Sequence, residues 1–247
     1  MDRNPAIRAL TVAVPVAVAG ATGVAIWALR RRGSTPDDGA PTDVGFMRAM
    51  HAALRRDLSR LEATAPNLDA EGRVPPDVRA AWARFQHALE RHHSAEDDDL
   101  WPVLRRHLVM SEEQQVVDRM VEEHDALTAA ISATDVALAT GGNVTDAVGE
   151  LGSLLRRHLE HEEQSALPLL ELHLSRDEWR HFLHTERRRT PVRERPEFLS
   201  WVLADAAEPD AAAVLAEIPP PGRLVYRKVL APRYAARHRS PTQAALS

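Results

Sequence analysis

The sequence places apolar residues at helical spacing in four long stretches. The stripes are, in chain order, Met47, Met50, Leu54, Leu58 and Leu61; Trp82, Phe85, Leu89, Leu100 and Val103; Val117, Met120, Val121, Leu127 and Ile131; and Val148, Leu151, Leu155 and Leu169. This period predicts amphipathic helices that turn one face towards a core. No strand-like alternation competes with it, and the connections are short. The predicted fold class is therefore all-α, with an antiparallel up-down four-helix bundle.

Turn and capping signals separate the predicted helices. The proline-containing segment 65–76 is expected to end the first helix. Ser111, followed by Gln114 three residues later, has the pattern of a capping box and is expected to open the third. Gly141-Gly142-Asn143 is expected to end that helix.

The pattern changes after the fourth helix. Ser175 and Glu178 form a second capping-box pattern, and further short helical pieces are expected near 196–206 and 210–230. We therefore expect a bundle over residues 44–173 and a C-terminal extension of short helices over residues 174–247.

A stretch without charged residues runs from Ala9 to Leu29, and as a helix it would span about 31 Å, the thickness of a bilayer core. Trp27 and the run Arg30 to Arg32 close it in the manner of an interfacial anchor. The alternative is a cleaved signal peptide, because Val18 to Ala21 resembles a cleavage site. The apolar stretch continues beyond that point, which favours an uncleaved anchor over residues 1–32 and a linker over residues 33–43.

The flanking charges predict the orientation of this single-pass segment. Arg30 to Arg32 and Arg48 follow it, whereas only Arg3 and Arg8 precede it, and this bias mildly favours a bundle on the cytoplasmic side. The small residues Ala19 and Gly23, four positions apart, make a homodimer through paired anchors a candidate assembly.

Composition narrows the chemistry. The chain has no cysteine, which excludes thiolate metal sites and disulfides, so any metal must be held by nitrogen and oxygen ligands. The net charge of −5 and the 4% aromatic content argue against a nucleic-acid partner. Arginine accounts for nearly all the basic residues, which is typical of a GC-rich bacterial genome.

Six histidines and glutamates fall inside the apolar stripes, and in an antiparallel bundle they meet at one height: His51, His92, Glu96, His124, His158 and Glu162. An unpaired buried polar group costs about 1–3 kcal/mol, so six would approach the whole stability of a domain, about 5–15 kcal/mol. No arginine or lysine shares these stripes at that height. A metal site satisfies all six, and the two His-x-x-x-Glu pairs suit bridging carboxylates flanked by terminal imidazoles.

Four ordered motifs carry a family resemblance. The segments HAALRRDL from His51, HHSAEDDDLWP from His92, EHDAL from Glu123 and HLEHEEQSALP from His158 resemble the four helices of the hemerythrin-like, HHE cation-binding family over about residues 44–172. The resemblance implies a non-haem di-iron centre that binds or reacts with oxygen or serves in iron and redox sensing. It implies that the four histidines are terminal ligands and that Glu96 and Glu162 are bridging carboxylates.

One departure from the family concerns the third helix. Oxygen-carrying hemerythrins have a second histidine four residues after the first, where this chain has Thr128. This predicts more open coordination, and hence oxidation to a stable state in place of reversible oxygen release. His93 is a candidate seventh ligand, with Glu123, His161 and Glu163 as weaker candidates. The run Asp97 to Asp99 is expected to be a solvated patch, and the remaining histidines are assigned no role.

These observations lead to a membrane-tethered non-haem di-iron protein, holding two iron ions, that binds or senses oxygen, nitric oxide or peroxide. A di-iron oxidase or peroxide-consuming enzyme and an iron-binding or storage module are alternatives, so enzymatic activity stays open. A plain helical interaction domain without metal fits the buried donors poorly. The expected partners are the small ligand and, through residues 9–29, the membrane.

Overall fold

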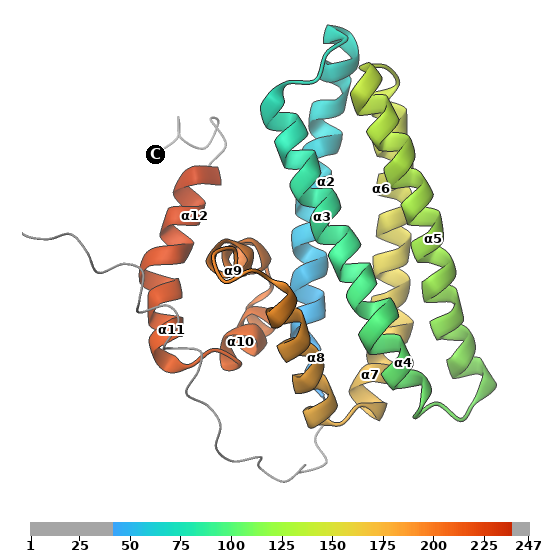
Figure 1. The fold of residues 1–247 in the computed structure, drawn as a ribbon, viewed down its shortest axis with the longest axis vertical. Coiled ribbons are helices and arrows are strands. Elements are labelled where there is room, and N and C mark those ends of the chain that lie inside the picture. The colour runs from blue at the N-terminus through green and yellow to red at the C-terminus, as the bar shows by residue number, and fades with distance from the viewer. Residues whose placement is uncertain (1–41, 239–247) are drawn as a thin grey trace, which may run out of the picture.

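The computed structural model describes residues 42–238 (Figure 1). The predicted membrane anchor over residues 1–32 and nearly all of the linker lie outside this range, as do residues 239–247. Between residues 42 and 238, no helix combines the length and the apolar composition needed to cross a membrane.

The bundle consists of four long helical rods that run up and down side by side (Figure 1). The first is α2 (Gly45–Glu71), and the third is α5 (Ser111–Thr140). The second consists of α3 (Pro76–Ala95), the π-helical η1 (Glu96–Leu100) and α4 (Trp101–Arg105). The fourth consists of α6 (Val144–His161), the π-helical η2 (Glu162–Ala166) and α7 (Leu167–His173). The predicted all-helical fold is confirmed.

The first helix ends at Glu71, inside the predicted segment 65–76, but Pro66 lies within α2 and does not end it. A proline removes one backbone hydrogen bond. Here Ala65 and Leu68 on either side are buried in the core, so their packing holds the helix together through this point. The helix is followed by Gly72, whose φ of 62° is the left-handed conformation typical of a helix C-terminus.

The two predicted capping boxes had different outcomes. The box at Ser175 is confirmed, because its side chain accepts from the Glu178 backbone N–H and the Glu178 side chain accepts from Ser175. The capping box predicted at Ser111 is wrong. The N-cap residue of α5 is Met110, and no side chain caps this end of the helix. The Ser111 hydroxyl instead lies 3.2 Å from a carboxylate oxygen of the adjacent Glu112.

The turn at 141–143 ends α5 as predicted. Gly141 has a φ of 73°, and a β-carbon at this position would lie 2.7 Å from the carbonyl oxygen of Gly72 in the neighbouring loop. Asp69, near the end of α2, then caps the next helix by accepting from the backbone N–H groups of Val144 and Thr145 at 2.7 and 2.9 Å. Two loops at the same end of the bundle are thereby joined.

The core of the bundle is divided by a polar layer. On one side lies an apolar cluster that includes Leu54, Leu89 and Leu155, and on the other lies a cluster that includes Met47, Leu100 and Met120. The buried histidines and glutamates fall between the two clusters in each helix. Side chains in this layer are thus surrounded by hydrocarbon along the bundle axis.

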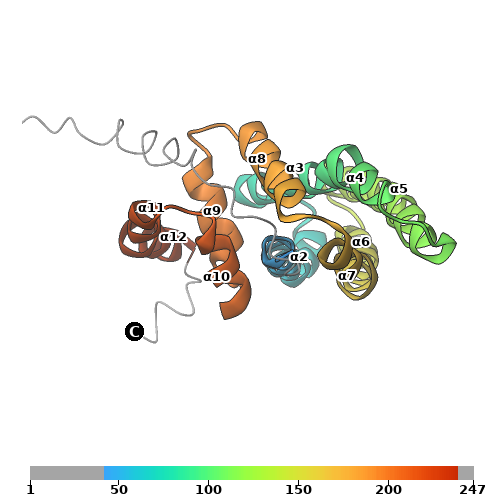
Figure 2. The ribbon, with the colours of Figure 1, turned by 90° about the horizontal axis from the view of Figure 1, so that it is seen from below.

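The C-terminal extension packs beside α2 and α3 (Figure 2). It consists of α8 (Arg176–Arg189), α9 (Arg195–Leu203), α10 (Glu208–Ala216), α11 (Pro220–Val225), the π-helical η3 (Tyr226–Leu230) and α12 (Ala231–His238). A third apolar cluster fixes it to α2, with Ala49 and Met50 against Val202, Leu203 and Val214. The extension therefore docks on the helix that carries His51.

Candidate metal centre

All six predicted side chains, together with His93, are buried in the polar layer. Their exposed fractions run from 0% for His51, Glu96 and Glu162 to 6% for His93. Each of the four bundle rods contributes at least one of them. The predicted burial of these side chains in the bundle core is thus observed, whereas their role as metal ligands is a proposal.

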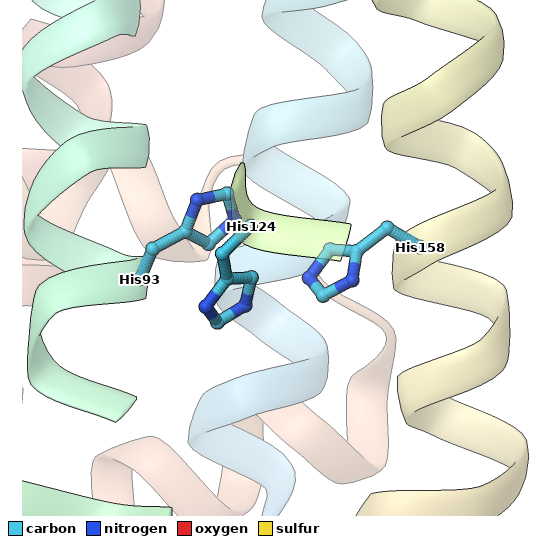
Figure 3. Close-up of side chains that lie close together, drawn as sticks. All are labelled: His93, His124 and His158. Atoms are coloured by element: carbon cyan, nitrogen blue, oxygen red, sulfur yellow. The ribbon is translucent and has the colours of Figure 1, made fainter. Parts of the chain in front are cut away.

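The donor atoms form two neighbouring groups. His93, His124 and His158 make up one group, in which one nitrogen of each ring lies within 4.8 Å of the others (Figure 3). The other group contains His51, His92, Glu96 and Glu162 and meets the same limit. Two groups of this size within one layer are the arrangement that a pair of metal ions requires.

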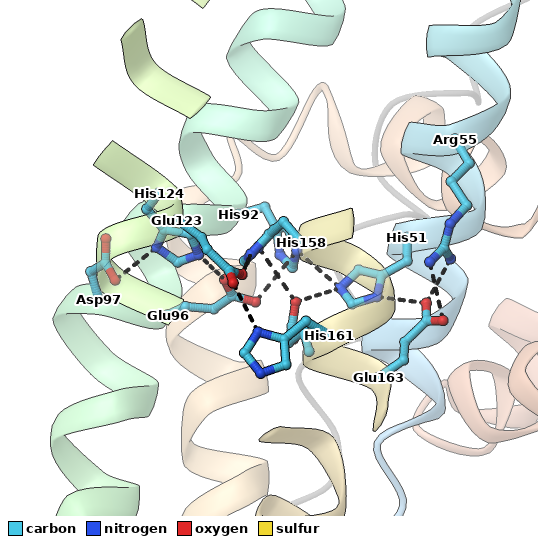
Figure 4. Close-up of polar contacts among 11 residues, drawn as sticks. His51, Arg55, His92, Glu96, Asp97, Glu123, His124, His158, His161 and Glu163 are labelled. Atoms are coloured by element: carbon cyan, nitrogen blue, oxygen red, sulfur yellow. Dashed lines mark hydrogen bonds and ion pairs between the residues drawn. The ribbon is translucent and has the colours of Figure 1, made fainter. Parts of the chain in front are cut away.

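The two glutamates connect the groups (Figure 4). One oxygen of Glu96 lies 3.3 Å from Nε2 of His92, and its other oxygen lies 3.3 Å from Nε2 of His124. One oxygen of Glu162 lies 3.1 Å from Nε2 of His51 and 3.8 Å from Nε2 of His158. Each carboxylate thus reaches one imidazole of either group, as a bridging ligand would.

Three of the imidazoles contact a carboxylate through Nδ1, the ring nitrogen that faces away from the centre of the layer. Nδ1 of His124 lies 2.9 Å from Asp97, Nδ1 of His51 lies 2.9 Å from Glu163, and Nδ1 of His158 lies 2.9 Å from Glu123. An imidazole that donates its Nδ1–H to a carboxylate presents the lone pair of Nε2 on its other side. In all three rings that nitrogen faces the centre of the layer.

Two of these outer carboxylates extend the network to the surface. Glu163 accepts two hydrogen bonds from the guanidinium of Arg55, at 2.6 and 3.1 Å. Glu123 also contacts Nδ1 of His161 at 2.9 Å. The weaker candidates Glu123, Glu163 and His161 therefore lie outside the ring of inward-facing donors, where they orient it.

Most of the inward-facing atoms lack partners of their own, apart from Nε2 of His51 and Nε2 of His92, which lie 3.2 Å from each other. Both oxygens of Glu96 and of Glu162, and Nε2 of His93, His124 and His158, are buried and make no well-formed hydrogen bond with the described residues. The histidine–glutamate approaches near 3.3 Å are close in distance but lack hydrogen-bond geometry. Buried polar atoms are normally satisfied. Imidazole and carboxylate donors left in this state fit a pair of cations of the iron, zinc or manganese type.

A local irregularity in the helix places each glutamate. Glu96 and Glu162 are the first residues of η1 and η2, and their carbonyls accept from the N–H groups five residues later, on Trp101 and Leu167. Pro102 and Pro168 follow directly in the sequence. A proline lacks the N–H that a regular helix needs, and π-turns are frequent at functional sites. Regular helices were expected for both rods, so the π-turns differ from the prediction.

The two carboxylates differ in their electrostatics. Burial, and then the charge of Glu162, raise the pKa of Glu96 to about 8. Burial also raises the pKa of Glu162, but the nearby His51 outweighs it and lowers that pKa to about 2. Two close carboxylates in an apolar core cannot both ionise easily, so without a cation one of them retains a proton.

The pKa values of the imidazoles are likewise raised in some rings and lowered in others. Burial lowers the pKa of His51, but Glu162 and Glu163 outweigh it and raise the value to about 9. Burial is likewise outweighed at His124, where Asp97 and Glu96 raise the pKa to about 10. Burial and the neighbouring imidazoles hold the pKa values of His92 and His93 well below the usual range. In the absence of metal, the layer therefore holds protons in place of cations.

Two expectations need correction. Asp97 was expected in a solvated patch, but it orients His124, and a signal for this was present because Asp97 follows Glu96 as Glu163 follows Glu162. Thr128 lies on the exposed face of α5, where its hydroxyl donates to the carbonyl of His124. The third imidazole of that group comes instead from His93 on α3.

Comparison with known proteins agrees with this geometry. The sequence profile of the hemerythrin HHE cation binding domain matches residues 42–170, which is more than half of the chain. An uncharacterized hemerythrin-like protein of Schizosaccharomyces pombe is 26% identical over 130 residues, which cover 52% of this chain and 63% of that protein. No solved structure matches. The chain belongs to the hemerythrin HHE cation-binding domain family.

Proposed function

We propose that the chain is a membrane-tethered non-haem di-iron protein that binds or senses oxygen, nitric oxide or peroxide. When bound, two iron ions would supply redox chemistry and coordination sites for such a small ligand. Five imidazoles, from His51, His92, His93, His124 and His158, would hold them together with the carboxylates of Glu96 and Glu162.

One observation carries this proposal, namely that each buried glutamate reaches an imidazole of both donor groups. Glu96 contacts His92 and His124, and Glu162 contacts His51 and His158. A single ion would leave one of the two groups, and half of each carboxylate, unsatisfied. Zinc suits the same donor types, so the preference for iron rests on the family.

The C-terminal extension favours sensing over storage. It contacts the bundle beside the residues of the centre, through ion pairs and hydrogen bonds at 2.8–2.9 Å: Arg189 with Asp99, Thr190 with Arg91, and Asp210 with Arg48. Asp99 lies in the π-turn that begins with Glu96, and Arg91 precedes His92. A change in the geometry of the centre would therefore alter the distances at these contacts between the bundle and the extension.

Metal analysis combined with spectroscopy tests the proposal. The purified full-length chain should contain two irons, and mixing the anaerobic reduced protein with oxygen in a stopped-flow instrument should produce a metal-dependent absorption change. Hydrogen exchange of α8 to α10 should differ before and after mixing if the extension responds. Absence of iron would overturn the proposal, as would iron without any spectral response, which would leave storage. Continued turnover of peroxide would favour the enzymatic alternative.

The membrane part of the proposal rests on the sequence alone. The uncharged stretch from Ala9 to Leu29 would anchor the chain, and the arginines that follow it would keep the bundle on the cytoplasmic side. This part is independent of the metal centre.

A further inference from the structure

The last helical rod of the chain has an unusual charge. From Pro220 to His238, through α11, η3 and α12, it contains four arginines and one lysine but no acidic residue. The chain as a whole is acidic, with a net charge of −5. This rod, at the outer edge of the molecule, therefore carries a net positive charge that no acidic residue of its own offsets (Figures 1 and 2).

One side of this rod packs and the other is free. Tyr226 contacts the apolar cluster shared with α9 and α10, and Tyr234 is buried, with 6% of its surface exposed. On the other side, Leu224 and Val225 are 59% and 41% exposed, although they are among the largest apolar side chains of the rod. The exposed side is thus not a purely polar surface.

Three cations of this rod are also exposed and have no partner within residues 42–238. Arg223 is used within the fold, since it donates to the carbonyls of Ile218 and Ala216, and Arg237 pairs with Glu197. Arg227, Lys228 and Arg233 are exposed and make no ion pair or hydrogen bond with another described residue. We name the surface formed by Leu224, Val225, Arg227, Lys228 and Arg233 the cationic face.

We propose that the cationic face lies against a bilayer that contains anionic lipid. Exposed aliphatic side chains among unpaired cations are the features of an interfacial helix, in which the aliphatic groups enter the headgroup region and the cations meet lipid phosphates. Phosphate on nucleic acid would use the cations but leave Leu224 and Val225 in water. This inference deepens the proposed membrane tether, since an anchor would hold the face near the surface that it recognises.

Single-cysteine labelling of the full-length chain tests this directly, because the natural sequence contains no cysteine. An environment-sensitive dye is placed at Leu224→Cys, with Val136→Cys as the matched control. Val136 is 63% exposed on α5, at the opposite edge of the molecule (Figure 2). Each labelled chain is incorporated into nanodiscs of phosphatidylcholine alone or with phosphatidylglycerol.

The dye at position 224 should shift to shorter wavelength and brighten only in the discs that contain phosphatidylglycerol, and the dye at position 136 should not respond. Replacing Arg227, Lys228 and Arg233 together by glutamate should weaken docking by at least on the order of a hundredfold and remove the response. A second measurement uses the labelled chain with its three cations unchanged. Raising the salt concentration should reverse the wavelength shift, because salt screens the attraction between the cations and the lipid.

Several results would overturn the inference. These are an equal signal in both kinds of disc, a signal that survives both charge reversal and high salt, or a response to duplex DNA without one to anionic discs. Failure of the tether is separable from this result. Incorporation into discs of phosphatidylcholine alone reports the anchor, whereas the dye reports the cationic face.

Discussion

Glu96 and Glu162 occupy equivalent positions in two copies of one local pattern. Each follows a histidine by four residues, begins a π-turn, and precedes a proline by six residues. The acidic residue after each one contacts Nδ1 of a histidine on a neighbouring helix. The centre is therefore built from two similar halves, in which each glutamate contacts the histidine four residues before it and a histidine on a neighbouring helix.

Removing these glutamates should empty the centre. The Glu96→Ala, Glu162→Ala double variant should lose both irons, and either single variant at least one, because each carboxylate lies between the two donor groups. The melting temperature should fall as well, because stabilisation by bound metal is lost. His87→Ala is the control, since His87 is exposed and should change stability by no more than about 0.5 kcal/mol. Equal iron content in the wild type and the double variant would contradict the assignment.

Metal binding should release protons. The pKa values of His51, His124 and Glu96 are raised to about 9, 10 and 8, so these groups hold protons at pH 7 when no metal is present. A metal ion displaces them, and its apparent affinity should therefore rise with pH through this range. Anaerobic calorimetry of iron(II) binding in buffers of different ionisation enthalpy measures the release. A binding enthalpy that is the same in all buffers would speak against it.

The sequence predicted the height of the polar layer in the bundle, because the helical period shows which histidines and glutamates lie on the same helix face as the leucines. His51 and His158 lie in apolar stripes that can be identified without coordinates. The orienting role of Asp97 could not be found from periodicity, since it depends on a contact between Asp97 and Nδ1 of His124 on a neighbouring helix.

The cap on α6 gives a prediction for pH. Hydrogen bonds from Thr145, and then from Val144, lower the pKa of Asp69, so its contribution to stability is present at neutral pH and is lost as the pH falls below about 4. Asp69→Ala should therefore lower the melting temperature by a few degrees at pH 7, and the difference from wild type should shrink towards pH 3. Asp125→Ala, at an exposed position on α5, should show neither effect. Thermal melts followed by circular dichroism decide this.

The proposed orientation can be tested in cells. If Arg30 to Arg32 and Arg48 keep the bundle in the cytoplasm, protease added to intact spheroplasts should leave residues 44–238 undigested. Lysis before the addition should expose the same segment and serves as the control. Digestion of the bundle in intact spheroplasts would place it outside and would revive the cleaved signal peptide.

The fold could be predicted more fully than the site for a physical reason. Helix ends such as Gly141 and Ser175 are determined by local backbone chemistry, which the sequence displays. Position 128 was judged by its spacing from His124, but the position that completes a donor group is determined by packing between helices. His93 fills that role from α3, and no local pattern distinguishes it from an exposed neighbour of His92.

This difference changes the expectation for oxygen. The prediction of irreversible oxidation rested on Thr128, which is exposed, whereas His93 supplies an imidazole to the group of His124 and His158. We therefore expect the wild type to recover more of its reduced spectrum under vacuum after exposure to oxygen than His93→Ala, in which open coordination favours irreversible reaction. Thr128→Ala should behave as the wild type and is the control. The measurement is anaerobic absorption before mixing, after mixing and after evacuation. Equal recovery in wild type and His93→Ala would show that His93 does not limit access to the centre.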